Sequence, residues 1–184
     1  MTTAIQIPGY VAGTWAIDAA HSTVAFSVRH LMVSKVRGTF RTFEGTLTTA
    51  ENPADSSVTA TIDLSSIDTN QPDRDNHIRS ADFFEVEKYP TMTYRSTGLR
   101  ADGDDFILDG ELDLHGVVKS VPLKLQLNGF GPDAYGGTRV GFEATTEISR
   151  NDFGIDIHMP LDGGGVVIGD KISISLDIEA VLQS

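Results

Sequence analysis

The sequence is dominated by an alternation of apolar and polar residues with a period of two, which is typical of β-strands that bury one face. Residues 106–115 show the pattern most clearly. Phe106, Leu108, Leu112 and Leu114 fall on one face of this segment, and Asp109, Glu111 and Asp113 fall on the other. A buried helix face needs apolar residues three or four positions apart, so the alternation predicts an all-β chain.

The same alternation recurs from residue 14 onwards. Residues 58–64 and 171–182 repeat it, and further strands are predicted at 15–18, 24–29, 38–48, 91–100, 118–130 and 138–148. Turn-forming clusters at 102–105 and 136–137 lie between these segments, where hairpin turns belong. Eight or nine such strands suit a closed up-and-down barrel or a two-sheet sandwich.

The polar faces are acidic and the chain begins with no export signal, so we expect the apolar faces to point inward rather than into a membrane. We predict an extended antiparallel up-and-down β-barrel of about eight strands, with one or two short helices closing it. Such a barrel can fill its interior with side chains or hold one small ligand. Composition does not decide between these.

Residues 72–84 favour a helix, because Pro72 suits a first turn and Asp73 and Asp75 complement the helix dipole there. A short helical turn is also predicted at residues 30–36. The segment 74–84 concentrates charged and aromatic side chains. It is interpreted as a structural plug of one barrel end or as a polar lid over a ligand, and the two roles can coexist.

The composition excludes several function classes. Without cysteine the chain offers no disulfide, no thiolate metal ligand and no cysteine nucleophile. A net charge of -12 disfavours nucleic acid as a partner. No stretch approaches the roughly 20 apolar residues of a membrane helix. We therefore expect a cytoplasmic protein without stable membrane insertion, with a flexible arm at residues 1–13 and one domain at 14–184.

No motif predicts catalysis or metal binding. Asp18, His21 and Ser22 are close in sequence, but catalytic triads are assembled from distant segments, and there is no GxSxG elbow. The glycine-rich segment 162–171 lacks the ending of a phosphate loop and precedes a strand, so a flexible connection is predicted. We expect Trp15 in the core at the barrel base. The histidines show no paired metal-ligand spacing: His21, His30, His77, His115 and His158.

A series of short sequence motifs occurs in a fixed order along the chain. They are Trp15-Ala16-Ile17-Asp18 with His21-Ser22, Val28-Arg29-His30-Leu31-Met32-Val33-Ser34, Val36-Arg37-Gly38-Thr39-Phe40, Ile67-Asp68-Thr69, Arg74-Asp75-Asn76-His77, Asp82-Phe83-Phe84, Tyr89-Pro90, Gly110-Glu111-Leu112, Leu114-His115-Gly116-Val117, Ser149-Arg150-Asn151-Asp152-Phe153-Gly154-Ile155 and Gly169-Asp170. Over residues 14–182 these motifs resemble those of the YceI family of lipocalin-like lipid-binding proteins. Val118, Ser120 and Ile78 depart from the family pattern.

The resemblance implies a lipocalin-like barrel whose apolar bore holds a polyisoprenoid or similar long-chain lipid, often in a homodimer. We predict binding, storage or transport of a polyisoprenoid or isoprenoid quinone, with no other cofactor, no metal and no catalytic residue. The predicted ligand contacts are the inward members of the alternating segments: Val24, Phe26, Val28, Ile62, Phe106, Leu108, Leu112, Leu114, Leu125, Val140, Phe142, Ile172, Ile174, Leu176 and Ile178.

Two other hypotheses stay open. The chain could be an enzyme acting on an isoprenoid lipid at the barrel mouth, with Arg74, His77 or His115 near the headgroup. That role requires a titratable group with a perturbed pKa. It could also be a structural or stress-response protein with a packed core and no ligand.

Overall fold

The computed structural model describes residues 6–30, 34–156 and 168–183. Within them the chain forms β-strands throughout, with one α-helix, α1 (Pro72–Arg79), and short 3-10 helices. The strands are β1 (Gly13–Ile17), β2 (Thr23–His30), β3 (Ser34–Phe40), β4 (Phe43–Thr49), β5 (Ser57–Asp63), β6 (Ile67–Asp68), β7 (Thr91–Asp102), β8 (Asp105–Leu114), β9 (Val117–Ser120), β10 (Leu123–Pro132), β11 (Thr138–Ser149) and β12 (Ile168–Leu182). The 3-10 helices are η1 (Ala19–His21), η2 (Pro53–Asp55), η3 (Leu64–Ser66) and η4 (Arg150–Phe153).

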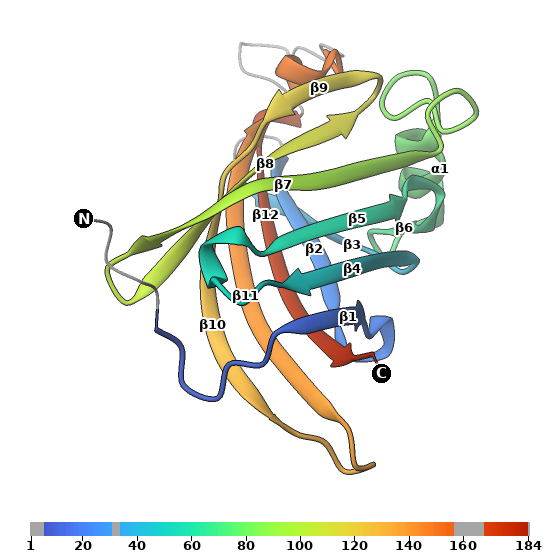
Figure 1. Ribbon diagram of the computed structural model, residues 1–184. Helices are drawn as coiled ribbons and strands as arrows, with labels where there is room; N and C mark the ends of the chain where they lie inside the picture. The colour runs from blue at the N-terminus through green and yellow to red at the C-terminus, as the bar shows by residue number, and fades with distance from the viewer. Residues whose placement is uncertain (1–5, 31–33, 157–167, 184) are drawn as a thin grey trace.

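Eight of the strands close into an antiparallel barrel (Figure 1). Their order is β1-β4-β5-β7-β8-β10-β11-β12, and β1 pairs back with β12 to close the ring. Trp15 lies opposite Leu182 in this closing pair. The predicted closed antiparallel barrel of about eight strands is confirmed.

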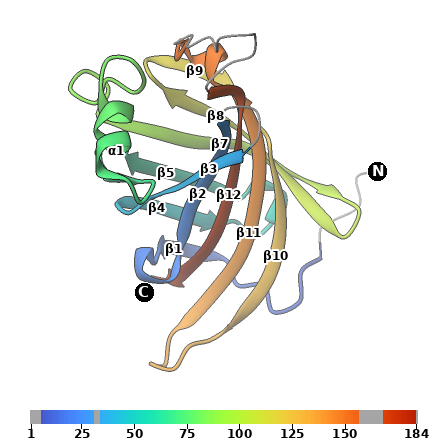
Figure 2. The same cartoon turned by 180° about the vertical axis from the view of Figure 1, so that it is seen from behind.

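The long strand β12 has two successive partners along one edge. Residues 168–177 pair with β2, and residues 180–182 pair with β1. The strands β2, β3 and β6 therefore form a branch that continues the sheet away from the closed ring (Figure 2). The sequence did not predict this branch, because alternation identifies the buried face of a strand and leaves its neighbours open.

Two segments predicted as single strands are each interrupted. The segment 38–48 turns at Arg41 and Thr42, so it contains the end of β3 and most of β4. The segment 118–130 breaks at Val121 and Pro122, where the Val121 amide donates to the Gly110 carbonyl at 2.9 Å. Pro122 has no N–H to donate to a neighbouring strand, which explains why the segment 118–130 is interrupted.

The helical turn predicted at residues 30–36 is wrong where the structure describes it. Residues 30 and 34–36 belong to the β2–β3 hairpin, in which Val28 lies opposite Val36 and residue 30 lies opposite Ser34. Residues 31–33 lie outside the described residues. The period-two alternation of β2 and β3 therefore extends up to both sides of the connection.

The helix predicted at 72–84 is present but shorter. It begins at Pro72 and ends at Arg79. Gln71 caps its N-terminus, where the Gln71 side chain accepts a hydrogen bond from the Asp73 amide. Residues 80–89 continue as turns in which the Phe84 amide donates to the Ile78 carbonyl at 3.0 Å. Helix α1 lies beside β6 at one end of the barrel (Figure 1). Within the described residues, no helix has the length and apolarity needed to cross a bilayer.

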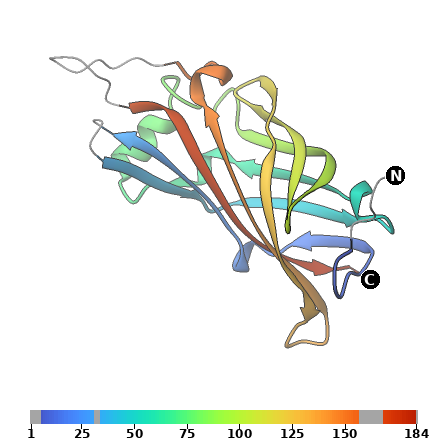
Figure 3. The same cartoon turned by 90° about the vertical axis from the view of Figure 1, so that its left-hand side faces the viewer.

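The barrel base has a separate apolar cluster of Trp15, Val140 and Ala180, with Phe130 packed against it. Trp15 is fully buried and donates its indole N–H to the Thr49 hydroxyl at 2.8 Å. The predicted core position of Trp15 is thus confirmed. At this end the β10–β11 hairpin extends past β1 (Figure 3).

Candidate functional site

An apolar cavity of about 400 Å³ lies inside the barrel, at the end covered by α1. Its walls are mainly side chains of β2, β3 and β12, and Ile78, Phe83 and Phe84 of α1 and the following turn contribute to its cover. We call this space the main cavity. The rings of Phe26 and Phe40 lie 5.6 Å apart, and those of Phe40 and Phe84 lie 6.1 Å apart, so aromatic packing joins the wall to the cover.

A second, smaller cavity of about 80 Å³ lies toward the barrel base. The segment before β1 contributes to its lining through Ile7 and Tyr10. The Tyr10 hydroxyl donates to the Ala50 carbonyl, and the Tyr10 ring packs edge-to-face on Phe130 at 5.4 Å. Residues 6–12 therefore contact the barrel here, and residues 1–5 lie outside the described residues.

The predicted ligand contacts fall into three groups. Six line the main cavity: Val24, Phe26, Val28, Leu114, Ile172 and Ile174. Five line the second cavity: Phe106, Leu108, Leu125, Val140 and Phe142. Four line neither and are buried or half-buried elsewhere in the core: Ile62, Leu112, Leu176 and Ile178. Contact of these residues with a ligand stays a prediction.

Several residues that line the main cavity were missed at the sequence level. Phe83 and Phe84 follow the helix in irregular turns, and Ile155 follows η4, so no periodicity marks their inward direction. Arg29 alternates onto the outer face of β2, yet it reaches the cavity near the strand end. Arg150 belongs to one of the motifs that carry the family resemblance, but only the fold of η4 reveals that its side chain is buried.

Polar side chains of α1 lie at the mouth of the main cavity. Arg74 donates from Nε to the Thr69 hydroxyl at 2.8 Å and from Nη2 to the Thr69 carbonyl at 2.6 Å. His77 Nε2 lies 2.8 Å from an Asp82 carboxylate oxygen, and its ring packs edge-to-face on Phe83 at 5.0 Å. The segment 74–84 therefore covers the cavity and also closes one end of the barrel.

The three residues suggested near a headgroup are not all at the mouth. Arg74 and His77 line the main cavity, whereas His115 is not among the residues that line it. His115 Nδ1 lies 3.0 Å from the Phe153 carbonyl oxygen, and its ring lies beside Tyr89 at 4.7 Å. Its surroundings indicate a structural role, in which it joins the turn between β8 and β9 to η4.

Arg150 holds the cavity wall together where η4 meets β12. Its guanidinium group donates to the carbonyls of Gly169 at 2.9 Å, Ile155 at 2.8 Å and Ile168 at 3.2 Å. The residue is buried, with 8% of its surface exposed. These bonds fix both the start of β12 and the chain after η4 around one charged group.

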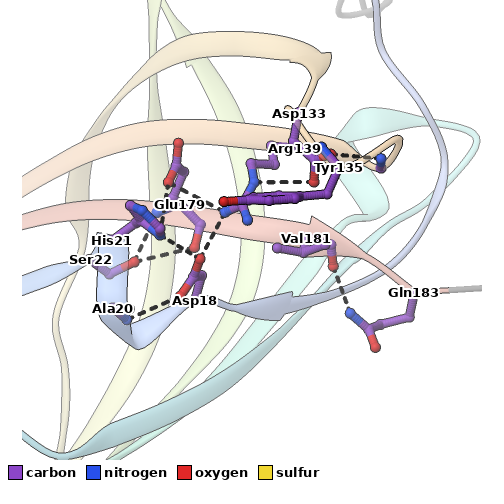
Figure 4. A network of polar contacts seen from close by, with 11 residues as sticks. Asp18, Ala20, His21, Ser22, Asp133, Tyr135, Arg139, Glu179, Val181 and Gln183 are labelled. Atoms are coloured by element: carbon purple, nitrogen blue, oxygen red, sulfur yellow. Dashed lines mark hydrogen bonds and ion pairs between the residues drawn. The ribbon is translucent and has the colours of Figure 1, made fainter.

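A polar network on the outside of the barrel links η1 to β11 and β12 (Figure 4). Arg139 donates to a carboxylate oxygen of Asp18 at 2.8 Å and lies 3.5 Å from a carboxylate oxygen of Glu179. His21 Nδ1 lies 2.7 Å from Asp18. The hydrogen bond from Arg139, assisted by that from His21, lowers the pKa of Asp18 to about 2.

Within the described residues, Asp18, His21 and Glu179 are close enough to share a metal ion. The Arg139 guanidinium already lies among them and neutralises the same carboxylates. The Ser22 hydroxyl donates to the Glu179 carbonyl at 3.2 Å and accepts from the Glu179 amide at 3.0 Å. Because these contacts attach η1 and its flanking residues to β11 and β12, the network has a structural role.

Comparison with known proteins connects this architecture to a family. A family model described as a YceI-like domain matches residues 15–180. The chain belongs to the YceI family. Protein YceI of Escherichia coli is 47% identical over 176 residues, which cover 94% of this chain and 89% of the relative. Protein YceI of Salmonella newport is 44% identical over the same shares. The resemblance seen in the sequence is confirmed.

Solved structures share the fold. BcnA of Burkholderia cenocepacia matches with a TM-score of 0.77 at 19% identity, over 89% of this chain and 98% of BcnA. The YceI protein of Campylobacter jejuni matches with a TM-score of 0.70 at 26% identity, over 85% and 90%. A domain from Saccharophagus degradans, described as polyisoprenoid-binding and implicated in plant cell wall breakdown, matches with a TM-score of 0.72 at 18% identity, over 94% and 100%.

Proposed function

We propose that this chain binds a long apolar lipid in the main cavity and stores or transports it, with a polyisoprenoid or isoprenoid quinone as the favoured class. The observation behind this proposal is the main cavity itself, whose wall is formed mainly by apolar side chains from β2, β3 and β12. Its volume of about 400 Å³ lies within the range of small-molecule sites. Each methylene group buried there would contribute ~0.8 kcal/mol before the costs of binding are subtracted.

The family comparison supports the ligand class. The Saccharophagus degradans domain that shares this fold is described as polyisoprenoid-binding. Flexible, branched apolar chains fit a cavity walled by aliphatic and aromatic side chains better than rigid polar molecules do. A cytoplasmic location and a homodimer remain parts of the proposal, to be tested by fractionation and by sedimentation.

We favour binding over catalysis because the two polar groups of α1 suggested near a headgroup, Arg74 and His77, already have partners. His77 is paired with Asp82, and Arg74 is bonded to Thr69. The Ser22 hydroxyl is bonded to the Glu179 backbone outside the barrel, so His21 does not activate it as a nucleophile.

Mass spectrometry of an organic extract of natively purified protein tests the proposal. We expect a long-chain lipid from the parent and strongly reduced lipid from Val28→Trp, because the larger side chain would fill the main cavity. The matched control is Val118→Trp, since Val118 is 55% exposed on β9. An empty extract from the parent would favour the packed-core hypothesis, and equal lipid in both variants would place binding elsewhere.

A further inference from the structure

Three arginine side chains from separate elements line the main cavity. Arg29 comes from the end of β2, Arg74 from α1 and Arg150 from η4. One carboxylate, that of Asp73, lines the same cavity. The lining of the main cavity therefore has an excess of positive charge, although the whole chain has a net charge of -12.

Within the described parts of the chain, none of the three arginines pairs with a carboxylate. Arg74 donates to Thr69, Arg150 donates to backbone carbonyls, and the Arg29 side chain makes no described hydrogen bond or ion pair. Arg100 differs, because on the outer surface it donates to Asp109 at 2.8 Å.

The arginines also retain unused donors. A guanidinium group has five N–H donors. Three bonds from Arg150 and two from Arg74 are accounted for by described partners, so both groups can donate further. A buried guanidinium group that faces only neutral carbonyl dipoles is poorly compensated, and a bound anion would correct this.

We propose that the main cavity selects lipids with an anionic headgroup, phosphate or carboxylate, held by Arg29, Arg74 and Arg150. This inference rests on the proposed lipid-binding function and narrows its ligand class to polyisoprenoids with a charged headgroup, which excludes an isoprenoid quinone. Charge-assisted hydrogen bonds from arginine are strong and match the oxygen geometry of both groups. A lipid with an uncharged headgroup would leave the buried Arg150 guanidinium facing neutral carbonyls alone.

The apolar chain and the anionic headgroup are both needed in this arrangement. The acidic surface of the protein repels free anions at long range, although salt screens this field beyond about 8 Å. Burial of the lipid chain in the main cavity overcomes that repulsion and brings the headgroup within hydrogen-bond distance of the arginines. Free pyrophosphate lacks this contribution and should bind far more weakly.

A competition experiment tests the inference. The intact protein is loaded from detergent with equal amounts of geranylgeranyl diphosphate and geranylgeraniol, which share one chain, and both lipids are quantified after extraction. We expect a preference for the diphosphate of about tenfold or more, as one added charge-assisted hydrogen bond provides. Arg29→Gln and Arg74→Gln should each reduce it. Arg95→Gln, an equal charge change at an exposed β7 residue, should leave it unchanged.

The possible outcomes separate this inference from the proposed function. Equal retention of the alcohol and the diphosphate would overturn headgroup selection and leave lipid binding intact. Retention of neither would overturn both. Calorimetric binding of pyrophosphate alone, as tight as that of the lipid, would show a free-anion site and overturn the inference. Arg29 and Arg74 keep the test valid even if changes at the buried Arg150 prevent folding.

Discussion

A carboxylate introduced separately at two positions of β12 distinguishes an open cavity from a packed core. Ile172 and Ile178 lie on the same face of this strand, opposite Ile148 and Phe142 of β11. Ile172 lines the main cavity. Ile178 is 5% exposed and lines neither described cavity. The pair Ile172→Glu and Ile178→Glu therefore compares one chemical change in two surroundings.

The expected costs follow from burial. Each substitution removes a buried apolar side chain, which costs ~1.5–3 kcal/mol. At Ile178 the new carboxylate has neither water nor a counter-charge, and an uncompensated buried charge adds ~3–5 kcal/mol. At Ile172 water can enter the main cavity once the ligand has left, so this second cost is largely avoided. We expect Ile178→Glu to melt ~6–12 °C or more below Ile172→Glu, at ~2–4 °C for each kcal/mol in a chain of this size.

Thermal unfolding followed by circular dichroism, with lipid extraction of the same samples, measures both effects. Ile172→Glu should be folded and free of lipid. The control Ile172→Val removes one methylene, at a cost of ~0.5–1.5 kcal/mol, and should keep the lipid. Equal melting temperatures for the two glutamate variants, or a full complement of lipid in Ile172→Glu, would refute the reasoning.

Two further predictions concern the barrel base and the outer network. Trp15→Phe removes the indole donor to Thr49 and leaves a small void, so we expect a loss of ~1–3 kcal/mol in urea denaturation, and an unchanged midpoint would contradict this. The folded-state pKa of Asp18, about 2, lies below its unfolded value of about 3.9, so its ionised form stabilises the fold above about pH 4. This stabilisation is lost as the pH falls toward 2. Asp18→Asn should therefore be less stable than the parent at neutral pH and converge with it near pH 2, whereas a pH-independent difference would argue against the Arg139 pairing.

The closed barrel and its buried faces could be predicted because period-two alternation directly encodes them. In β8, Leu108, Leu112 and Leu114 are buried, while Glu111 and Asp113 are exposed, as the pattern indicates. The same reasoning placed Phe26 and Ile172 on the inner faces of strands that line the main cavity.

Other features depend on contacts between distant segments, which alternation does not encode. The branch formed by β2, β3 and β6 arises because β12 changes partner along its length. Arg150 is buried because three carbonyls from two segments converge on it. The glycine-rich connection predicted at 162–171 lies outside the described residues up to 167, and residues 168–171 begin β12.

Affinity as a function of chain length tests the proposed lipid site most directly. Geraniol, farnesol and geranylgeraniol share one headgroup and differ only in the number of isoprene units. Binding measured by calorimetry should tighten with each added unit, because every methylene buried in the main cavity contributes up to ~0.8 kcal/mol, and Val28→Trp should abolish this dependence. Equal affinities for the three alcohols, or a chain-length dependence that persists in Val28→Trp, would contradict a ligand site inside the barrel.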